Sequence, residues 1–439
     1  MNKTKIFAST GRPIMQSISP QLHNAAYHAL GLDAVYIRLA AENAKLALQA
    51  AKQIGMSGLN VTTPYKNDFV GLMDSLDSSA LRIGAVNTVK ISNGRTKGFN
   101  TDGNGVTGAL LADGIRIKGK KTVVLGAGGA AMAATYALCA SGAKVTVANR
   151  TFEKAKALAK KFGCAACSLG EKDLAGAFDG AGIIVSALST TERVVPKKLF
   201  AKNMVVLEAM YSRESALVSD AKAAGCKVIH GRQWLLWQGT RAFEIFTNRK
   251  APAKAMANAL AKKRHDEKSN IALVGFMGSG KTKTAKQIAR LAGLKFIETD
   301  AKIEKKAGKS INEIFAHGGE KEFRRLERQT IGIAAKSKNS VISCGGGAVL
   351  DARNARALAK TCVMVWLWAN PDEILRRVDK EKHRPLLNVK DKKGKIESLL
   401  NRRIPKYAAC ADLAVGTQGM EPKEIAKLII DETHMASKD

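Results

Sequence analysis

Two glycine-rich segments of this 439-residue chain have the residue types and the spacing of phosphate-binding turns. Residues 275–282 read GFMGSGKT, and residues 126–131 read GAGGAA. The backbone N–H groups of such turns surround a phosphate, and the helix that follows favours negative charge at its N-terminus. The chain is therefore predicted to carry two nucleotide sites.

The turn at 126–131 follows an apolar strand and opens a helix, which is the context of a dinucleotide site. An NAD site usually has Asp or Glu at the end of the next strand, where it holds the ribose 2′-hydroxyl. Here that strand, KVTVA, ends in Asn149-Arg150-Thr151. A guanidinium suits a 2′-phosphate, so we predict NADP(H) rather than NAD. A glycine-rich turn that only reverses the chain is the alternative. The predicted cofactor contacts are Gly126, Ala127, Gly128, Gly129, Ala130, Asn149, Arg150, Thr151 and Lys154.

The turn at 275–282 satisfies GxxxxGK[ST] between the apolar run IALV and the helix-like TKTAKQIARLAG. In this pattern Lys281 reaches the β- and γ-phosphates of ATP, and the Thr282 hydroxyl is a ligand of Mg²⁺. The predicted nucleotide contacts are Gly278, Ser279, Gly280, Lys281, Thr282 and Lys283. The pattern alone does not say which acceptor receives the phosphoryl group.

The elements that position these turns come in three blocks. Residues 1–100 alternate strand-like and helix-like stretches, which predicts βα units and a mostly parallel sheet. The alternation restarts at 121 in the order of a dinucleotide-binding half-sheet. The charged stretch AKKRHDEKSN predicts a linker near 265–269, and a third block begins at 270.

The composition, with 46% hydrophobic and 5% aromatic residues, suits a soluble α/β protein. No apolar run approaches the roughly 18–20 residues that cross a bilayer, and the N-terminus lacks the apolar core of a signal peptide. The single CxxC, from Cys164 to Cys167, is interpreted as ordinary thiols because no second pair or histidine accompanies it. We expect a cytoplasmic protein with no membrane partner.

The net charge of +33 is spread along the chain and is not gathered in a tail. Such a charge attracts nucleic acid, but it also favours small anionic substrates. No groove-reading motif or Lys/Arg-rich helix is present, so we expect no nucleic-acid partner. A basic nucleic-acid- or regulator-binding protein that uses the second turn as a switch stays open as an alternative.

Five segments carry a resemblance to a known family over residues 6–250 or so. They read GRPIMQSISPQLHNAAY, GLNVTTPYK, GAVNTV, GFNTDGNG and GRQWLLWQGTRAFE. In this order they resemble the shikimate dehydrogenase family, which reduces 3-dehydroshikimate to shikimate with NADPH. The resemblance implies that Lys66 and Asp102 are the catalytic pair, with Lys66 protonating the alkoxide that hydride transfer leaves. It also implies that Gly231 contacts the cofactor and that the substrate contacts are Ser17, Ser19, Thr62, Asn87, Tyr211 and Gln238.

Single residues of this set have simpler interpretations and some depart from the family pattern. Asp102 precedes a helix and could be an N-cap, and Lys66 alone could be a surface lysine. Gln16 stands where the family usually has His. The segment EAMYSRESAL lacks the usual Asp, Pro and Thr, having Glu208, Arg213 and Ser215 instead. That departure puts cofactor affinity in question.

The segments FIETDAKIEKKAGKSINEIF, GEKEFRRLE, ISCGGGAV, HRPLL and RRIPKYAACA resemble shikimate kinase over residues 270–416. The resemblance implies that Asp300 binds ring hydroxyls and helps to deprotonate the acceptor, and that Arg384 in a lid contacts the transferred phosphate. Glu298 replaces the first Asp of the family's Asp-Thr-Asp. The other implied contacts are Arg324 and Arg403 to the shikimate carboxylate, Gly345, Gly346 and Gly347 over the ring, and Arg377 against adenine.

Together the resemblances predict a bifunctional chain that makes shikimate and then phosphorylates it. Residues 1–265 would be the dehydrogenase, with 1–102 and about 234–263 as its substrate-binding part and 103–233 as its Rossmann NADP part. Residues 270–439 would be a P-loop, nucleoside-monophosphate-kinase-like α/β/α domain with a parallel sheet. A chain with one active half, or a dehydrogenase that also accepts quinate, stays open, as do the oligomeric state and any channelling.

Overall fold

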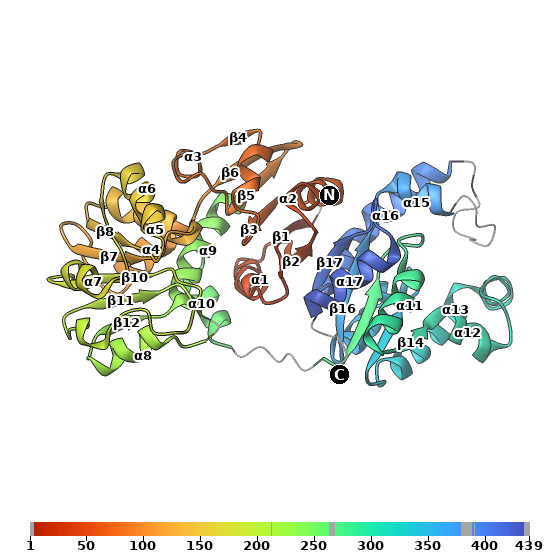
Figure 1. Ribbon diagram of the computed structural model, residues 1–439. Helices are drawn as coiled ribbons and strands as arrows, with labels where there is room; N and C mark the ends of the chain where they lie inside the picture. Colours follow the sequence, from red (N-terminus) through yellow and green to blue (C-terminus); the bar gives the residue numbers. More distant parts are fainter. Residues whose placement is uncertain (1–3, 212, 263–267, 379–388, 390, 434–439) are drawn as a thin grey trace. The chain divides into compact units, whose positions relative to one another are not determined.

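The computed structural model describes residues 4–211, 213–262, 268–378, 389 and 391–433. By their contacts the residues form two compact units. Unit 1 contains 1–20, 33–65 and 263–439, and unit 2 contains 21–32 and 66–262. Each unit is built on parallel β-sheet with helices packed against it (Figure 1). The α/β fold class expected from the alternating pattern is confirmed.

The strands of unit 1 pair in the order β14-β15-β13-β16-β17-β2-β1-β3, and every pair is parallel. Strands from the first and last thirds of the chain thus share one sheet, because β2 pairs with β17 through Leu39↔Ala414 and Ala40↔Val415. The strands are β1 (Lys5–Gly11), β2 (Ala34–Ala40), β3 (Gly58–Val61), β13 (Asn270–Val274), β14 (Lys295–Glu298), β15 (Ser340–Ser343), β16 (Cys362–Trp368) and β17 (Leu413–Gly416).

Burial explains why these segments are strands. The central β16, CVMVWLW, is buried at every position, as a strand covered on both faces requires. Helices α11 and α17 cover one face, where their aliphatic side chains join those of the strands in one core cluster. The helices of unit 1 are α2 (Ala44–Ile54), α11 (Lys281–Ala292), α12 (Thr299–Ala307), α13 (Ile311–Ala334), α14 (Ala352–Ala359), α15 (Pro371–Val378), α16 (Lys392–Cys410) and α17 (Pro422–Thr433).

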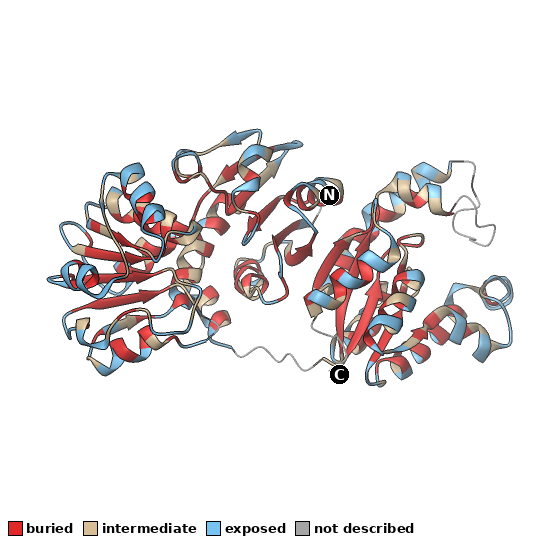
Figure 2. Ribbon diagram, in the orientation of Figure 1, coloured by how far each residue is buried: buried red, intermediate tan, exposed pale blue. Residues whose placement is uncertain are grey.

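Unit 2 contains a six-stranded parallel sheet in the order β12-β11-β10-β7-β8-β9. The chain starts at β7, winds outward through β8 and β9, and then returns to the other side of β7 for β10, β11 and β12. This doubly wound order creates a switch point beside β7. Separate core clusters lie on the two faces of this sheet, so its strands are the buried layer in Figure 2. The strands are β7 (Lys121–Leu125), β8 (Lys144–Ala148), β9 (Ala165–Cys167), β10 (Ile183–Ser186), β11 (Val205–Glu208) and β12 (Lys227–Ile229).

A smaller β-ribbon and the remaining helices complete unit 2. Strand β5 (Thr88–Ser92) pairs antiparallel with β6 (Arg95–Phe99), and the short β4 (Ser75–Leu76) pairs with β6. The segment 231–261 forms two helices, α9 and α10, because α9 ends at Asn248, a left-handed cap with φ of 54°. The helices are α3 (Ser78–Ile83), α4 (Asp102–Ala112), α5 (Gly129–Ala140), α6 (Phe152–Phe162), α7 (Glu171–Phe178), α8 (Ala216–Ala223), α9 (Gly231–Thr247) and α10 (Ala253–Ala261).

Helix α1 (Ser19–Ala29) begins in unit 1 and runs into unit 2, where it packs on α9 through an aromatic cluster of His23, Tyr27, Phe243 and Phe246. Residues 265–267 of the predicted linker lie outside the described residues, as does Arg384 with the HRPLL segment. In the part of the chain that the structure describes, no helix is long and apolar enough to span a bilayer.

Candidate active sites

The first glycine turn joins β7 to α5 at the switch point of the unit 2 sheet. Gly126 has φ of 107°, which favours glycine, and a Cβ there would lie 3.1 Å from the carbonyl oxygen of Ala187. A Cβ added at Gly128 or Gly129 would meet no atom within 4 Å. The N-terminus of α5 is therefore open on the side where a pyrophosphate would bind.

The end of β8 lies next to this turn, since Gly126 N donates to Ala148 O at 2.8 Å. Asn149 Nδ2 donates a hydrogen bond to Thr151 O at 3.0 Å, whereas the side chains of Arg150 and Lys154 are exposed. Among the described residues, neither Arg150 nor Lys154 forms an ion pair. Two unengaged cations at this strand end fit a 2′-phosphate better than a ribose hydroxyl.

Lys66, Asp102 and Asn87 form a hydrogen-bonded group in unit 2. Lys66 Nζ donates to Asp102 Oδ2 at 2.5 Å, and Asn87 Nδ2 donates to Asp102 Oδ1 at 2.8 Å. The side chains of Lys66 and Asp102 are 19% and 10% exposed. Gln238 is the fourth member, because its Oε1 accepts from Asn87 Nδ2 and Thr101 Oγ1 at 3.4 Å each.

The geometry shows that the Asp102 side chain does not cap its helix. Asp102 is the first residue of α4, and both of its carboxylate oxygens are used by Lys66 and Asn87. Its backbone is held from α9, where Trp234 Nε1 donates to Asp102 O at 3.0 Å. Trp234 is buried and was not among the predicted site residues. Its place in GRQWLLWQ, four residues before Gln238, was the available signal, because i and i+4 share one face of a helix.

Ser17, Ser19 and Thr62 belong to unit 1. They follow the carboxyl ends of β1 and β3, which are adjacent parallel strands and therefore end at the same edge of the sheet. Ser17 Oγ accepts from Ser19 N at 3.3 Å, Ser19 is buried, and Thr62 is exposed. The three hydroxyls are thus grouped at one sheet edge, where ligands of α/β folds usually bind.

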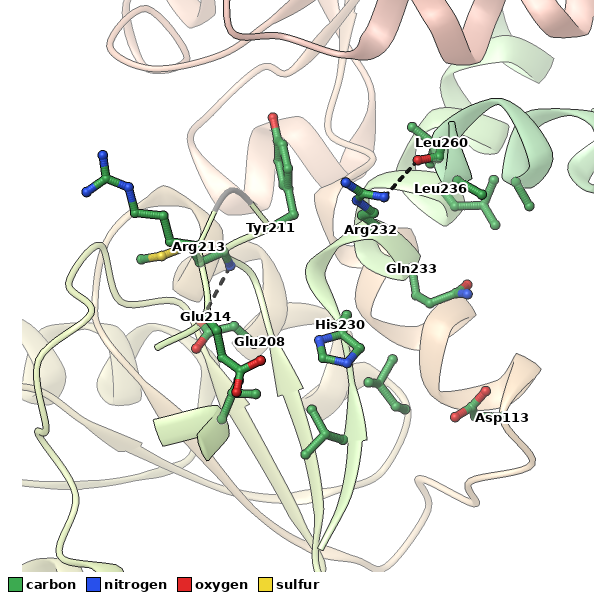
Figure 3. Close-up of a pocket in the computed structure, with 16 residues that line it drawn as sticks. Asp113, Glu208, Tyr211, Arg213, Glu214, His230, Arg232, Gln233, Leu236 and Leu260 are labelled. Atoms are coloured by element: carbon green, nitrogen blue, oxygen red, sulfur yellow. Dashed lines mark hydrogen bonds between the residues drawn. The ribbon is translucent and has the colours of Figure 1, made fainter. Parts of the chain in front are cut away.

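Tyr211 lines a cavity of about 620 Å³ in unit 2, which also has Glu208, Arg213, His230 and Arg232 in its wall (Figure 3). Arg232 Nη1 donates to Leu260 O at 3.0 Å, which ties α9 to the end of α10. The carboxylate of Glu208 accepts from Ser215 Oγ at 2.7 Å, and burial raises the pKa of this carboxyl. Two of the residues that depart from the family pattern therefore bind each other.

Gly231 opens α9 where this helix passes the end of β11. A Cβ on Gly231 would lie 2.5 Å from Ala209 O and 2.7 Å from Met210 O. Both contacts are to backbone atoms, which cannot move aside as a flexible side chain can. Only glycine therefore allows α9 to lie this close to the segment after β11. The predicted cofactor contact is therefore also a position at which packing requires glycine.

The second glycine turn connects β13 to α11 in unit 1, and it lines a cavity of about 890 Å³. Gly275, Gly278 and Gly280 have φ of 140°, 76° and 92°, all in the region that favours glycine. A Cβ on Gly275 would lie 2.4 Å from Leu367 O. Lys281 Nζ donates to Phe276 O at 2.9 Å across the turn, and Lys283 is exposed.

Oxygen-bearing side chains surround Thr282 at the floor of this cavity. Thr282 Oγ1 donates to Glu298 Oε1 at 2.7 Å and lies 3.2 Å from Ser343 Oγ. Within the described residues, the buried Ser279 Oγ has no hydrogen-bond partner. Hydroxyl and carboxylate oxygens are the donors that Mg²⁺ prefers, and a buried hydroxyl without a partner inside the turn fits a missing phosphate. The residues present therefore fit Mg²⁺ and a nucleotide.

The residues predicted to hold shikimate in the kinase part lie close together. A Cβ on Gly345 would lie 2.6 Å from Asp300 Oδ1, and one on Gly347 would lie 2.7 Å from Arg324 Nη1. Arg403 is buried, with its guanidinium carbon 5.4 Å from the centre of the Phe276 ring. The three glycines thus leave space between the Asp300 carboxylate and the Arg324 guanidinium. The backbone is held from α16, because Gly346 O accepts from the Tyr407 hydroxyl at 2.5 Å.

Glu327 is a site residue that the sequence reasoning missed. Arg324 Nη1 donates to Glu327 Oε2 at 2.8 Å, and the Glu327 side chain is 1% exposed. Burial raises the pKa of Glu327, and the charge of Arg324 opposes that shift. Within the described residues, Glu327 Oε1 has no hydrogen-bond partner. The i, i+3 spacing on one helix was the signal for this pair.

Arg377 spans the far wall of the nucleotide cavity. Its Nη1 donates to Gly278 O at 3.2 Å and its Nη2 to Thr417 O at 3.0 Å. Glu373 Oε1 accepts from Arg377 Nε at 2.6 Å, which orients the guanidinium plane. Its contact with adenine stays a prediction, and so does the role of Arg384, which lies outside the described residues.

Comparison with protein-family models matches the chain in four segments. Residues 10–89 match the shikimate dehydrogenase substrate binding domain, 110–213 the shikimate/quinate 5-dehydrogenase model, and 235–261 the shikimate 5′-dehydrogenase C-terminal domain. Residues 277–434 match shikimate kinase. The matches follow one another along the chain without overlap.

Individual relatives match the first part of the chain. It is 38% identical over 280 residues to the NADP(+) shikimate dehydrogenase of Methanocaldococcus jannaschii, covering 60% of this chain and 98% of that protein. The corresponding protein of Natronomonas pharaonis is 41% identical over 262 residues, with coverages of 58% and 98%. The structure of Thermus thermophilus shikimate 5-dehydrogenase in complex with NADP(H) and shikimate matches with a TM-score of 0.54 and 35% identity, covering 58% and 98%.

Proposed function

Since the chain belongs to the shikimate dehydrogenase family and also carries a shikimate kinase domain, we propose that it catalyses two consecutive reactions. The first is the NADPH-dependent reduction of 3-dehydroshikimate to shikimate, and the second is the ATP-dependent phosphorylation of shikimate to shikimate 3-phosphate. The dehydrogenase would occupy residues 1–265 and the kinase 270–439. The observation that carries the first activity is the bonded group of Lys66, Asp102 and Asn87.

In the dehydrogenase, bound NADPH supplies the hydride. Lys66 would protonate the oxygen of the reduced carbonyl, because its ammonium is a proton donor that Asp102 holds in place. Asp102 orients the Lys66 ammonium, and Asn87 keeps Asp102 in place. The remaining substrate contacts are proposed for Ser17 and Ser19 to the carboxylate, and for Thr62, Asn87, Gln238 and Tyr211 to the rest of the ring.

The same part of the chain would take NADPH in preference to NADH. The backbone of Gly126, Ala127, Gly128, Gly129 and Ala130 would hold the pyrophosphate, with Gly231 close to the nicotinamide end. Asn149, Arg150, Thr151 and Lys154 would hold the adenosine ribose and its 2′-phosphate. The exposed cations at this strand end support the choice of NADP(H).

In the kinase, bound ATP supplies the phosphoryl group and Mg²⁺ neutralises its charge. Lys281 and the turn around Gly278, Ser279, Gly280 and Lys283 would hold the phosphates, and Thr282 would be a ligand of the metal. Asp300 orients and helps to deprotonate the acceptor hydroxyl, and Arg324 and Arg403 hold the shikimate carboxylate as planar forks. We propose a cytoplasmic location, which supplies both NADPH and ATP.

A second substrate for the dehydrogenase is supported by two comparisons. One family model is described as shikimate/quinate 5-dehydrogenase, and the quinate dehydrogenase of Corynebacterium glutamicum in complex with NAD matches with a TM-score of 0.54 and 28% identity. We expect kcat/KM to be higher for shikimate than for quinate in the oxidation direction. Measuring kcat/KM for shikimate and for quinate shows which of the two substrates the dehydrogenase prefers.

One coupled assay tests the proposed function. Purified full-length protein receives 3-dehydroshikimate, NADPH, ATP and Mg²⁺, and shikimate 3-phosphate is measured by mass spectrometry. Omitting ATP should stop the reaction at shikimate, and supplying shikimate directly should remove the need for NADPH. Failure of one step alone would mean that only one half is active. Consumption of neither nucleotide, together with a salt-sensitive gel shift, would favour nucleic-acid binding instead.

A further inference from the structure

The loop that carries Ser17, residues 12–18, packs into the C-terminal half of unit 1. This loop leaves β1 after Gly11 and enters α1 at Ser19. Two of its apolar side chains, those of Ile14 and Met15, are 0% and 7% exposed. They belong to the same core cluster as Ile425, Leu428 and Ile429 of α17. A dehydrogenase-half loop is thus part of the hydrophobic core of the kinase half.

Glu432 on α17 satisfies the backbone of this loop. Its Oε2 accepts from Ile14 N at 2.7 Å and from Met15 N at 3.0 Å, and the residue is 1% exposed. Two consecutive buried N–H groups directed at one carboxylate oxygen form a charge-assisted clamp. Without that oxygen both N–H groups would be buried and would lose this acceptor, which is costly.

Arg38 of β2 holds the loop from its other end. The guanidinium donates to Ser17 O from Nε at 2.9 Å and from Nη2 at 2.6 Å. Its Nη1 donates to Asp412 O at 3.2 Å, immediately before β17. Arg38 is 5% exposed and lies next to Leu39, which pairs with Ala414. The strand pairing that joins the two halves therefore also positions the Ser17 backbone.

We propose that Glu432 is a positioning residue for the dehydrogenase, although it lies in the kinase half. Glu432 binds the backbone of Ile14 and Met15 and thereby fixes the position of the turn that carries Ser17. The Ser17 hydroxyl is then placed to bind the substrate carboxylate. Arg38 completes the arrangement by anchoring Ser17 O to the β2–β17 junction. The inference rests on the proposed role of Ser17 in binding 3-dehydroshikimate.

The test uses full-length Glu432→Ala and Glu432→Gln and measures both activities. We expect Glu432→Ala to raise the KM for 3-dehydroshikimate roughly tenfold, which is about the effect of one unsatisfied buried group. The kcat should change less than the KM, and the kinase KM values for shikimate and ATP should stay within about twofold of wild type. Glu432→Gln keeps an acceptor oxygen and should recover most of the loss.

Hydrogen exchange followed by mass spectrometry gives a readout that does not depend on turnover. Exchange in the peptide covering residues 12–18 should become faster in Glu432→Ala and stay slow in Glu432→Gln. The matched control is Asp431→Ala, one residue away on α17, whose side chain is 62% exposed and pairs only weakly with Arg12 at 3.4 Å. This control should change neither the exchange nor the KM.

Ser17→Ala separates the inference from the proposed function. If Ser17→Ala raises the KM and Glu432→Ala does not, the role of Glu432 is wrong and the proposed function stands. If neither Ser17→Ala nor Glu432→Ala changes the KM, the assignment of Ser17 is wrong and so is the role inferred for Glu432. If Glu432→Ala does not fold, Arg38→Lys provides the second route, because lysine keeps the charge and loses the forked contact with Ser17 O. An unchanged KM in Arg38→Lys would then overturn the inference.

Discussion

At the scale of residues, the two proposed centres each join a basic residue to a buried carboxylate. Asp102 binds Lys66 with one oxygen and accepts from Asn87 with the other, so the lysine faces a carboxylate of fixed orientation. Arg324 donates to Glu327, which is 1% exposed. Lys66 and Arg324 were assigned from motifs, and their roles stay predictions. Of the carboxylates that bind them, Asp102 was predicted and Glu327 was not. Such partners are determined by proximity in the folded structure.

Arg150→Ala should raise the KM for NADPH by roughly tenfold, since an exposed guanidinium bound to a phosphate contributes a charge-assisted but partly screened contact. The KM for NADH should change less than twofold. Steady-state kinetics with both cofactors measure this. Arg116→Ala, which removes another exposed arginine of the same unit, is the matched control and should affect neither. An equal effect of Arg150→Ala on both cofactors would remove the argument for the 2′-phosphate.

Glu208→Gln should stabilise the protein at neutral pH. Burial raises the folded-state pKa of Glu208 above its ordinary value of 4.5, so the carboxyl is easier to ionise in the unfolded chain. Its contribution to stability is therefore present below pH 4.5 and is lost as pH rises through the folded-state pKa. Glutamine does not titrate, so the stability advantage of the variant in urea unfolding should grow as the pH rises above 4.5.

Glu214 offers a control of opposite sign for that experiment. Its pKa is lowered by the hydrogen bond from Lys222, so its contribution to stability is present above its unfolded-state pKa. Glu214→Gln should thus lose a little stability at neutral pH, as is usual for an exposed pair. A Glu208→Gln variant that loses stability relative to wild type as pH rises would contradict the interpretation.

At the scale of elements, glycines decide which helices approach closely enough to build the dehydrogenase centre. Helix α4 carries Asp102 at its start and crosses α9 at Gly105 and Gly108, which face Trp234 and Trp237. Of these two glycines, only Gly105 lies in the family segment GFNTDGNG. Both let an indole ring lie against the α4 backbone, and the ring of Trp234 donates to Asp102 O.

Gly105→Ala should destabilise unit 2 by about 1–3 kcal/mol, the usual cost of an overpacked core. The added Cβ would lie 2.4 Å from Trp234 Cδ1 and 2.7 Å from Trp234 O. The midpoint of urea unfolding measures the effect, and dehydrogenase activity should fall with it. Gly176→Ala in α7 is the control, because nothing lies within 4 Å of its Cβ. That change should leave stability unaltered or raise it by about 0.4–1 kcal/mol. Equal midpoints for Gly105→Ala and wild type would count against this packing argument.

At the scale of the whole molecule, the division by contacts does not follow the order of the chain. Strands β1, β2 and β3 belong to the same unit as the strands of residues 268–433, and β2–β17 is the pairing that joins them. The two glycine turns belong to different units. The proposed kinase is thus connected to the substrate-binding segment of the proposed dehydrogenase by backbone hydrogen bonds as well as by the linker.

The two activities should nevertheless be separable by single substitutions. Lys66→Ala should abolish NADPH oxidation and leave the kinase near wild type, and Lys281→Ala should do the reverse. An equimolar mixture of the two variants should convert 3-dehydroshikimate to shikimate 3-phosphate after a lag, because shikimate released by one protein diffuses to the other. Mass spectrometry follows both products. Loss of both activities in either single variant would contradict independent chemistry.

The sequence by itself determined the chemistry of the chain and the general form of its sheets. Glycine-rich turns, strand alternation and the order of the family segments depend on local backbone conformation and on residue type, both of which are written along the chain. The tertiary structure alone decided that Glu432 and Arg38 clamp the Ser17 loop, that Trp234 supports Asp102 and that β2 pairs with β17. These contacts join residues up to 418 positions apart, and only burial and packing select such partners.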